Sequence, residues 1–136
     1  MSEILQLSLY LKGDDLDPNE ATLAFGITPT RSHLKGDVID SPQGRLVRKS
    51  TGLWCFSVRS DKIDFPVLFS DFFSKISRAA EKMLSVRGVE ERYIDILFIK
   101  GADGGGTIDF DLGTNEICSL AKLGIPVMFT ISIARE

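Results

Sequence analysis

The alternation of apolar and polar residues is clearest near the start of the chain, where it predicts a β-strand. Four leucines there alternate with polar residues: Leu5, Leu7, Leu9 and Leu11. A period of two is typical of a strand that is buried on one face. The same period recurs in four later segments, each of which is predicted to be a strand: 53–60, 93–100, 107–112 and 127–133. In the last of them we expect four side chains to be buried: Val127, Phe129, Ile131 and Ile133.

Helices are predicted where the apolar period changes to 3.6 residues. The longest such stripe covers 67–87, follows Pro66 and ends at Gly88. A short helix is predicted over 17–25, because Asp17 and Pro18 suit the N-cap and first helical positions and a glycine follows at 26. A third helix is predicted over 114–123, before a glycine at 124.

These elements follow one another in the order β-α-β-β-α-β-β-α-β, within one domain that spans 1–136. Residues 45–49 and 53–60 are predicted to pair as a hairpin around a turn at 50–52. Residues 31–44 are expected to form a loop with room for one short strand. Hairpins and alternating strands favour a single α+β domain with a mainly antiparallel sheet and helices packed on one face.

The composition excludes several classes of function. The chain has 136 residues, 16 Lys and Arg against 19 Asp and Glu, one His, two Cys and a net charge of −3. An acidic balance does not favour nucleic acid or an anionic membrane as partner. The first residues do not resemble a signal peptide and no apolar run is long enough to span a membrane, so we expect a cytoplasmic protein with free thiols.

Three segments resemble chemical motifs without meeting their requirements. Residues 15–19 begin like a calcium loop, but Glu20 stands where that loop requires glycine and Gly26 where it requires glutamate. The glycine-rich segment 101–107 lacks the lysine of a phosphate-binding loop and is predicted to be a turn between strands. His33 has no nucleophile fixed beside it by a recognisable motif. We therefore expect no metal, no cofactor and no catalytic residue.

One face of the predicted sheet is polar and carries two tyrosines and three aspartates. The residues on it that we expect to bind a partner are Tyr10, Arg59, Tyr93, Asp95, Asp109 and Asp111. Tyrosine is frequent where binding energy is concentrated, and carboxylates attract a basic partner. The competing interpretation is the ordinary solvated side of an antiparallel sheet.

The order of these residues resembles the bacterial domain of unknown function 4279 family. The resemblance rests on the following segments: 13–18 (Gly-Asp-Asp-Leu-Asp-Pro), Glu20, 25–30 (Phe-Gly-Ile-Thr-Pro-Thr), 35–37 (Lys-Gly-Asp), Trp54, the helix 67–87 and 123–125 (Leu-Gly-Ile). It implies no established activity and no catalytic residues. It also implies a likeness to the immunity proteins of bacterial toxin systems.

Two functional hypotheses follow. The first is a non-catalytic protein-binding domain, in its most specific form an immunity protein that neutralises a basic toxin domain by direct binding. The alternative is a small-ligand-binding or enzymatic domain with a site in the loop region 14–37, around four polar residues: Asp14, His33, Lys35 and Asp37. Such residues lie near strand and helix ends, where binding sites are frequent.

Overall fold

A five-stranded sheet forms the centre of the protein in a computed structural model, which describes residues 3–61, 64–101 and 109–134. The strand order is β2-β5-β1-β6-β7. Their bounds are β1 (Ile4–Gly13), β2 (Arg31–His33), β5 (Gly52–Ser60), β6 (Glu91–Gly101) and β7 (Val127–Ala134). The central strand β1 is antiparallel to both β5 and β6, whereas β6 and β7 are parallel. The predicted α+β class with a mainly antiparallel sheet is confirmed.

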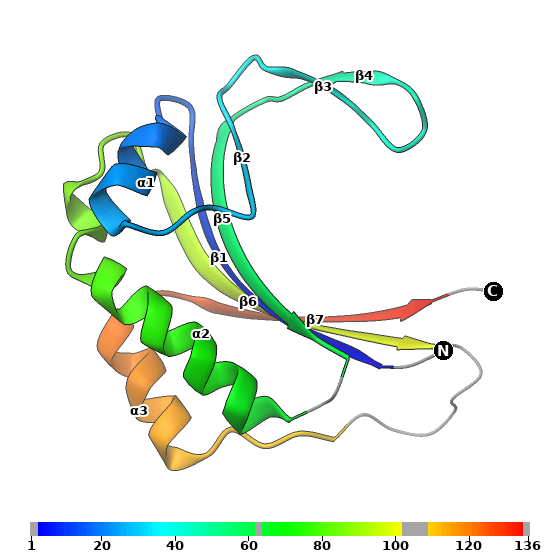
Figure 1. Cartoon of the computed structure of the whole chain (residues 1–136), viewed down its shortest axis with the longest axis vertical. Helices are drawn as coiled ribbons and strands as arrows, with labels where there is room; N and C mark the ends of the chain where they lie inside the picture. Colours follow the sequence, from blue (N-terminus) through cyan, green and yellow to red (C-terminus); the bar gives the residue numbers. More distant parts are fainter. Residues whose placement is uncertain (1–2, 62–63, 102–108, 135–136) are drawn as a thin grey trace.

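Three helices cover one face of this sheet and leave the other without a helical layer (Figure 1). They are α1 (Pro18–Phe25), α2 (Phe65–Ala80) and α3 (Thr114–Leu123). A 3-10 turn, η1 (Met83–Ser85), follows α2, so the regular helix ends earlier than the predicted 87. None of the helices in the described ranges has the length and apolarity that crossing a membrane requires.

The core lies between the helices and the β1 leucines, which are at most 1% exposed. Trp54 on β5 is fully buried, meets Phe25 of α1 edge to face, and donates a hydrogen bond from Nε1 to Thr22 Oγ1 at 3.1 Å. The predicted start and end of α1 are confirmed. The Asp17 side chain accepts a hydrogen bond from the Asn19 amide, and Gly26 takes the left-handed conformation, with φ of 67°.

The predicted strand 107–112 is wrong for the residues that the structure describes, because 109–112 are not part of any strand. Phe110 packs instead against Phe98 of β6 and Phe65 of α2, with ring centroids 4.5 and 5.6 Å away. The glycine-rich turn predicted at 101–107 lies, from 102 on, outside the described residues. Since 109–112 add no strand, the chain passes through α3 from β6 to β7, and these two strands run parallel.

The hairpin predicted from 45–49 and 53–60 is also wrong. The structure pairs β3 (Val38–Asp40) with β4 (Leu46–Arg48) as a separate two-stranded sheet. The reversal occurs at 41–44, where the Gly44 amide donates to the Ser41 carbonyl at 2.9 Å and Gly44 has φ of 77°. As a result β5 pairs with β1 and β2, and the β3–β4 hairpin projects away from the helices (Figure 1).

The expected burial of the last strand is wrong for most of its apolar side chains. Phe129, Ile131 and Ile133 are 51%, 61% and 65% exposed. They lie on the face of the sheet that carries the helices, but β7 extends beyond the ends of α2 and α3 (Figure 1). A period of two therefore identified the strand, but not the extent of the layer that covers it.

Candidate binding surface

The helix-free side of the sheet, which we call the open face, is the candidate binding surface. Alternation along each strand, together with the pairing register, determines which side chains it carries. From β2, β5 and β1 these are Arg31, His33, Leu53, Cys55, Ser57, Arg59, Gln6, Ser8, Tyr10 and Lys12. From β6 and β7 they include Glu91, Tyr93, Asp95, Leu97, Met128 and Thr130.

A stacked pair of tyrosines lies at the centre of the open face. The rings of Tyr10 and Tyr93 are 4.9 Å apart between centroids and inclined by 19°. Lys12 Nζ lies 5.6 and 5.2 Å from these two centroids, within the range of a cation–π contact. Arg31 Nη2 donates a hydrogen bond to the Tyr10 hydroxyl at 3.2 Å. The two aromatic rings are therefore held in place by two cationic side chains.

These contacts also change the acidity of the groups involved. A hydrogen bond with Tyr93 raises the pKa of Lys12 against the opposing effect of its partial burial, so the ammonium remains charged at neutral pH. Burial is the main cause that raises the pKa of Tyr10, with Cys55 acting in the same direction and Arg31 opposing both. Tyr10 is therefore a neutral hydrogen-bonding group near pH 7.

Hydrogen bonds join most of the remaining polar side chains of the open face. Ser8 and Ser57 are linked between their hydroxyls at 2.7 Å, and Arg59 Nε donates to Gln6 Oε1 at 2.9 Å. The Asp95 carboxylate accepts a hydrogen bond from Thr130 Oγ1 at 2.8 Å. These bonds restrict the side chains to one arrangement, which lowers the entropy that binding would have to remove.

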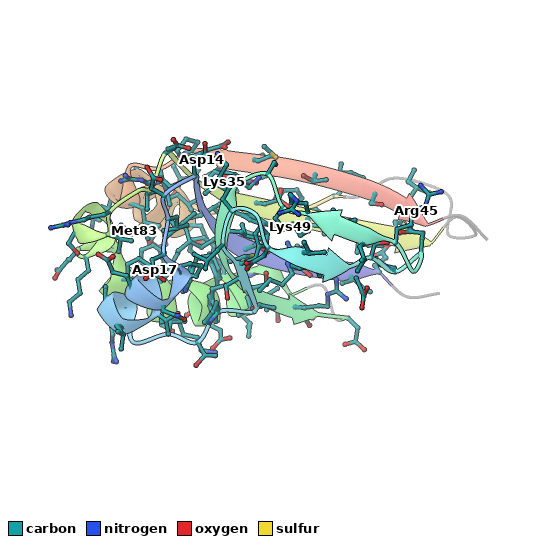
Figure 2. All side chains as sticks on the ribbon, turned by 90° about the horizontal axis from the view of Figure 1, so that it is seen from above. Asp14, Asp17, Lys35, Arg45, Lys49 and Met83 are labelled. Carbon is teal, nitrogen blue, oxygen red and sulfur yellow. The ribbon has the colours of Figure 1, made fainter. Side chains whose placement is uncertain are left out.

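The loop region of the alternative hypothesis borders the open face. Lys35 Nζ lies 3.2 Å from Asp14 Oδ2, and Asp37 accepts a hydrogen bond from the Leu34 amide at 2.8 Å. The Lys35 hydrogen bond is the main cause that lowers the pKa of Asp14. Figure 2 shows Asp14 and Lys35 side by side, with Lys49 between this pair and Arg45 in the β3–β4 turn.

His33 lies half-buried beside these residues. Its pKa is lowered by burial and next by the Lys49 charge, with a smaller contribution from Arg31; a backbone hydrogen bond with Thr51 and the Asp37 charge act in the opposite direction. The neighbouring hydroxyl of Ser32 does not share this side of β2, because Ser32 pairs with Trp54 and His33 with Leu53. The two residues are thus not arranged as a nucleophile and its base.

The structure brings together four of the six residues predicted to bind a partner: Tyr10, Arg59, Tyr93 and Asp95. It separates the other two, Asp109 and Asp111, from that group. They border a hollow of about 310 Å³ at the start of α2, on the helix-covered side where Phe110 packs. The prediction that three aspartates share one face is wrong, because the segment that carries two of them is not a strand.

Cations rather than carboxylates dominate the half of the open face above β2, β5 and β1. Arg31, Arg59 and Lys12 lie there, and Lys49 borders it. The sequence indicated Lys49 only as part of a small basic group with Arg45 and Arg48, and it did not indicate Arg31 or Lys12. The alternation in β1 does assign Lys12 to the side of Tyr10, but no sequence pattern brings β2 and residue 49 beside it.

No group of three or more His, Cys, Asp and Glu side chains is gathered for a metal ion within the described ranges. The arrangement on the open face is one of fixed aromatic rings, hydroxyls and cations. Such a surface can bind through stacking, hydrogen bonding and attraction of negative charge.

The fold and the open face define a small α+β domain with an aromatic and cationic sheet surface that no helix covers. The chain belongs to the family described as Domain of unknown function (DUF4279), whose family model matches residues 3–134. No curated protein and no solved structure matches the chain.

Proposed function

We propose that the chain is a non-catalytic protein-binding domain and that the open face is its partner-binding surface. The observation that carries this proposal is the rigid Tyr10–Tyr93 pair, uncovered by any helix and fixed by Lys12 and Arg31. Tyrosine and arginine are enriched among the residues that dominate binding energy. Side chains that are already ordered lose little entropy when a partner binds.

The β3–β4 hairpin supports the same proposal. It exposes four apolar side chains, with exposed fractions between 38% and 73%: Val38, Ile39, Leu46 and Val47. A hollow of about 550 Å³ lies between this hairpin and β2, and Ile39, Val47 and Leu53 contribute to its lining. Apolar side chains gathered next to a polar face are typical of a surface that a partner covers.

The charges of the open face favour an acidic contact surface on the partner. Arg31, Arg59, Lys12 and Lys49 would attract carboxylates, whereas Asp95 is already hydrogen-bonded to Thr130. In its most specific form the proposal is a cytoplasmic bacterial immunity protein that covers a toxin domain. A toxin bound at the open face would then present an acidic segment there, rather than the basic surface expected from the sequence.

The experiment is a calorimetric titration of the purified chain with the protein encoded by the neighbouring reading frame. The test variant is the double charge reversal Arg31→Glu, Arg59→Glu. The matched control is Arg78→Glu, Lys82→Glu, which makes the same charge change at exposed positions at the end of α2 and just after it. We expect at least a tenfold loss of affinity in the test variant and little change in the control, since two cationic contacts are reversed in only one of them.

Equal affinity of the two double variants would overturn the assignment of the open face. Tighter binding by the test variant would overturn the acidic partner and favour a basic one. Both variants are first compared with the parent chain by urea unfolding, so that a loss of binding is not a loss of folding.

A further inference from the structure

A small hollow at one edge of the open face has features that a protein-binding surface does not require. Its volume is about 270 Å³, and it lies where β1 and β2 approach the segment 49–51. Eight residues line it: Tyr10, Lys12, Arg31, His33, Lys49, Ser50, Thr51 and Leu53. Three of these are cations and none is a carboxylate.

The cations of this hollow form no close ion pair with a described acid, although the Glu91 charge opposite Lys12 on β6 contributes to the raised pKa of Lys12. Within the described parts of the chain, no carboxylate lies within ion-pair distance of Lys12, Arg31 or Lys49. Lys35, which is outside the hollow, lies 3.2 Å from the Asp14 carboxylate, and a hydrogen bond with Thr51 of the lining is a further cause that lowers the pKa of Asp14. Three like charges around one hollow repel one another, and an anion between them would remove that repulsion.

His33 lines the hollow and is affected by the charges around it. Its pKa is lowered not only by burial but also by the charges of Lys49 and Arg31, which disfavour a further positive charge at the imidazole. A backbone hydrogen bond with Thr51 acts on it in the opposite direction, as does the charge of Asp37, whose carboxylate is hydrogen-bonded to the Leu34 amide. The imidazole is thus a neutral hydrogen-bonding group in a positive environment.

We propose that this hollow is a binding site for a phosphate group. One guanidinium is enough to pair with a carboxylate. Three cations together with the Ser50 hydroxyl suit a tetrahedral dianion with several acceptor oxygens. The volume accommodates a phosphate and a few further atoms, which fits a small phosphorylated molecule or one phosphorylated side chain. The site goes beyond the proposed protein-binding function, because it needs no protein partner to be occupied.

The test uses the purified chain alone and follows the imidazole of His33 by NMR, which is unambiguous because the chain has one histidine. Inorganic phosphate and sulfate are titrated at constant ionic strength, with sodium chloride as reference. We expect a saturable change in the His33 signals and an imidazole pKa that rises when sulfate is bound, since a bound dianion stabilises the imidazolium. Sulfate is included because it remains a dianion throughout this pH range.

Two single variants, Arg31→Gln and Lys49→Gln, should each weaken sulfate binding about tenfold. Lys75→Gln is the matched control, because it removes one positive charge from α2, where Lys75 is paired with Asp71 at 3.5 Å. A signal change that does not saturate, or that is equal in the control and in both test variants, would overturn the site. The emission of Trp54 confirms that each variant is folded.

A further arm compares inorganic phosphate with a short phosphoserine peptide. Tighter binding of the peptide would assign the phosphate group to a protein, and equal affinity would assign it to a small molecule. Absence of anion binding would overturn only this inference, since the partner titration under the proposed function is measured without added phosphate or sulfate.

Discussion

Replacing Thr22 by valine tests how α1 is attached to the sheet. Trp54 is fully buried and its Nε1 donates to Thr22 Oγ1 at 3.1 Å, while that hydroxyl itself donates to the Pro18 carbonyl at 3.1 Å. Valine has nearly the size of threonine, so the substitution removes the hydroxyl without opening a cavity. It leaves the indole N–H without its acceptor where water has little access, which costs about 1–3 kcal/mol.

The assay is urea unfolding followed by tryptophan emission, because Trp54 is the single tryptophan of the chain. If the same variants are unfolded by heat, each kcal/mol lost should lower the Tm of a domain of this size by roughly 3–5 °C. Thr22→Ser keeps the hydroxyl and should recover most of the loss. Thr114→Val, at an exposed position, should stay within about 0.5 kcal/mol of the parent chain. A role for the Thr22–Trp54 hydrogen bond in stability would be excluded if Thr22→Val is as stable as Thr114→Val, or if Thr22→Ser is no more stable than Thr22→Val.

Three further predictions concern backbone contact, pH and core packing. Gly13→Ala should lower the free energy of unfolding in urea by at least about 3 kcal/mol, because the added methyl group would overlap the Gly88 carbonyl. Gly36→Ala is the control, since Gly36 lies in open space with φ of 89°, and it should lower that free energy by only about 1 kcal/mol. Equal losses in the two variants would contradict this prediction. Because the pKa of His33 is lowered in the folded protein, the unfolded chain binds more protons than the folded chain as the pH falls. The stability that the neutral imidazole contributes is therefore fully present above the unfolded pKa of ~6.5 and is lost as the pH falls through that pKa and then through the folded one. His33→Gln should flatten that pH dependence, and an unchanged profile would contradict it. Phe72→Ala should cost about 3–5 kcal/mol, since its ring is fully buried; a loss below about 1 kcal/mol would show that the core closes around the gap.

Local patterns predicted the elements whose surroundings are also local. The alternating leucines of β1 are all buried, as predicted, because β1 is the central strand of the sheet and its leucines lie on the side that the helices cover. The ends of α1 were predictable because Asp17 and Gly26 satisfy backbone groups within a few residues of themselves. The same holds for Gly124, which ends α3 in the left-handed conformation.

The errors occur where packing over a distance decides the result. Residues 107–112 have strand-like alternation, but Phe110 is held against Phe98 and Phe65, and no neighbouring strand pairs with 109–112. The turn at 50–52 has suitable residues, yet β4 finds its partner in β3 and not in β5. An alternating pattern records which side chains prefer burial, but it does not record which backbone supplies the hydrogen bonds.

The candidate surface was predictable only in part, for the same reason. Tyr10, Tyr93 and Asp95 could be assigned to one face because they lie on long, regular strands. Arg31 reaches that face through β2, a strand of three residues within a segment that has no clear period. Lys49 reaches it because the chain returns there from the β3–β4 hairpin, and the Gly36 amide bonds to its carbonyl.

The net charge of −3 therefore describes the open face poorly. At physiological ionic strength charges further apart than about 8 Å are largely screened from one another. A group approaching the Tyr10 ring is governed by Lys12 and Arg31, whose charged groups lie 5.6 and 5.9 Å from the ring centroid, and not by acids on the helices. An acidic protein can for this reason have a surface that selects anions. Its overall negative charge also opposes non-specific attachment to nucleic acid, so we expect the open face to bind by local contacts and not by the long-range field of the whole protein.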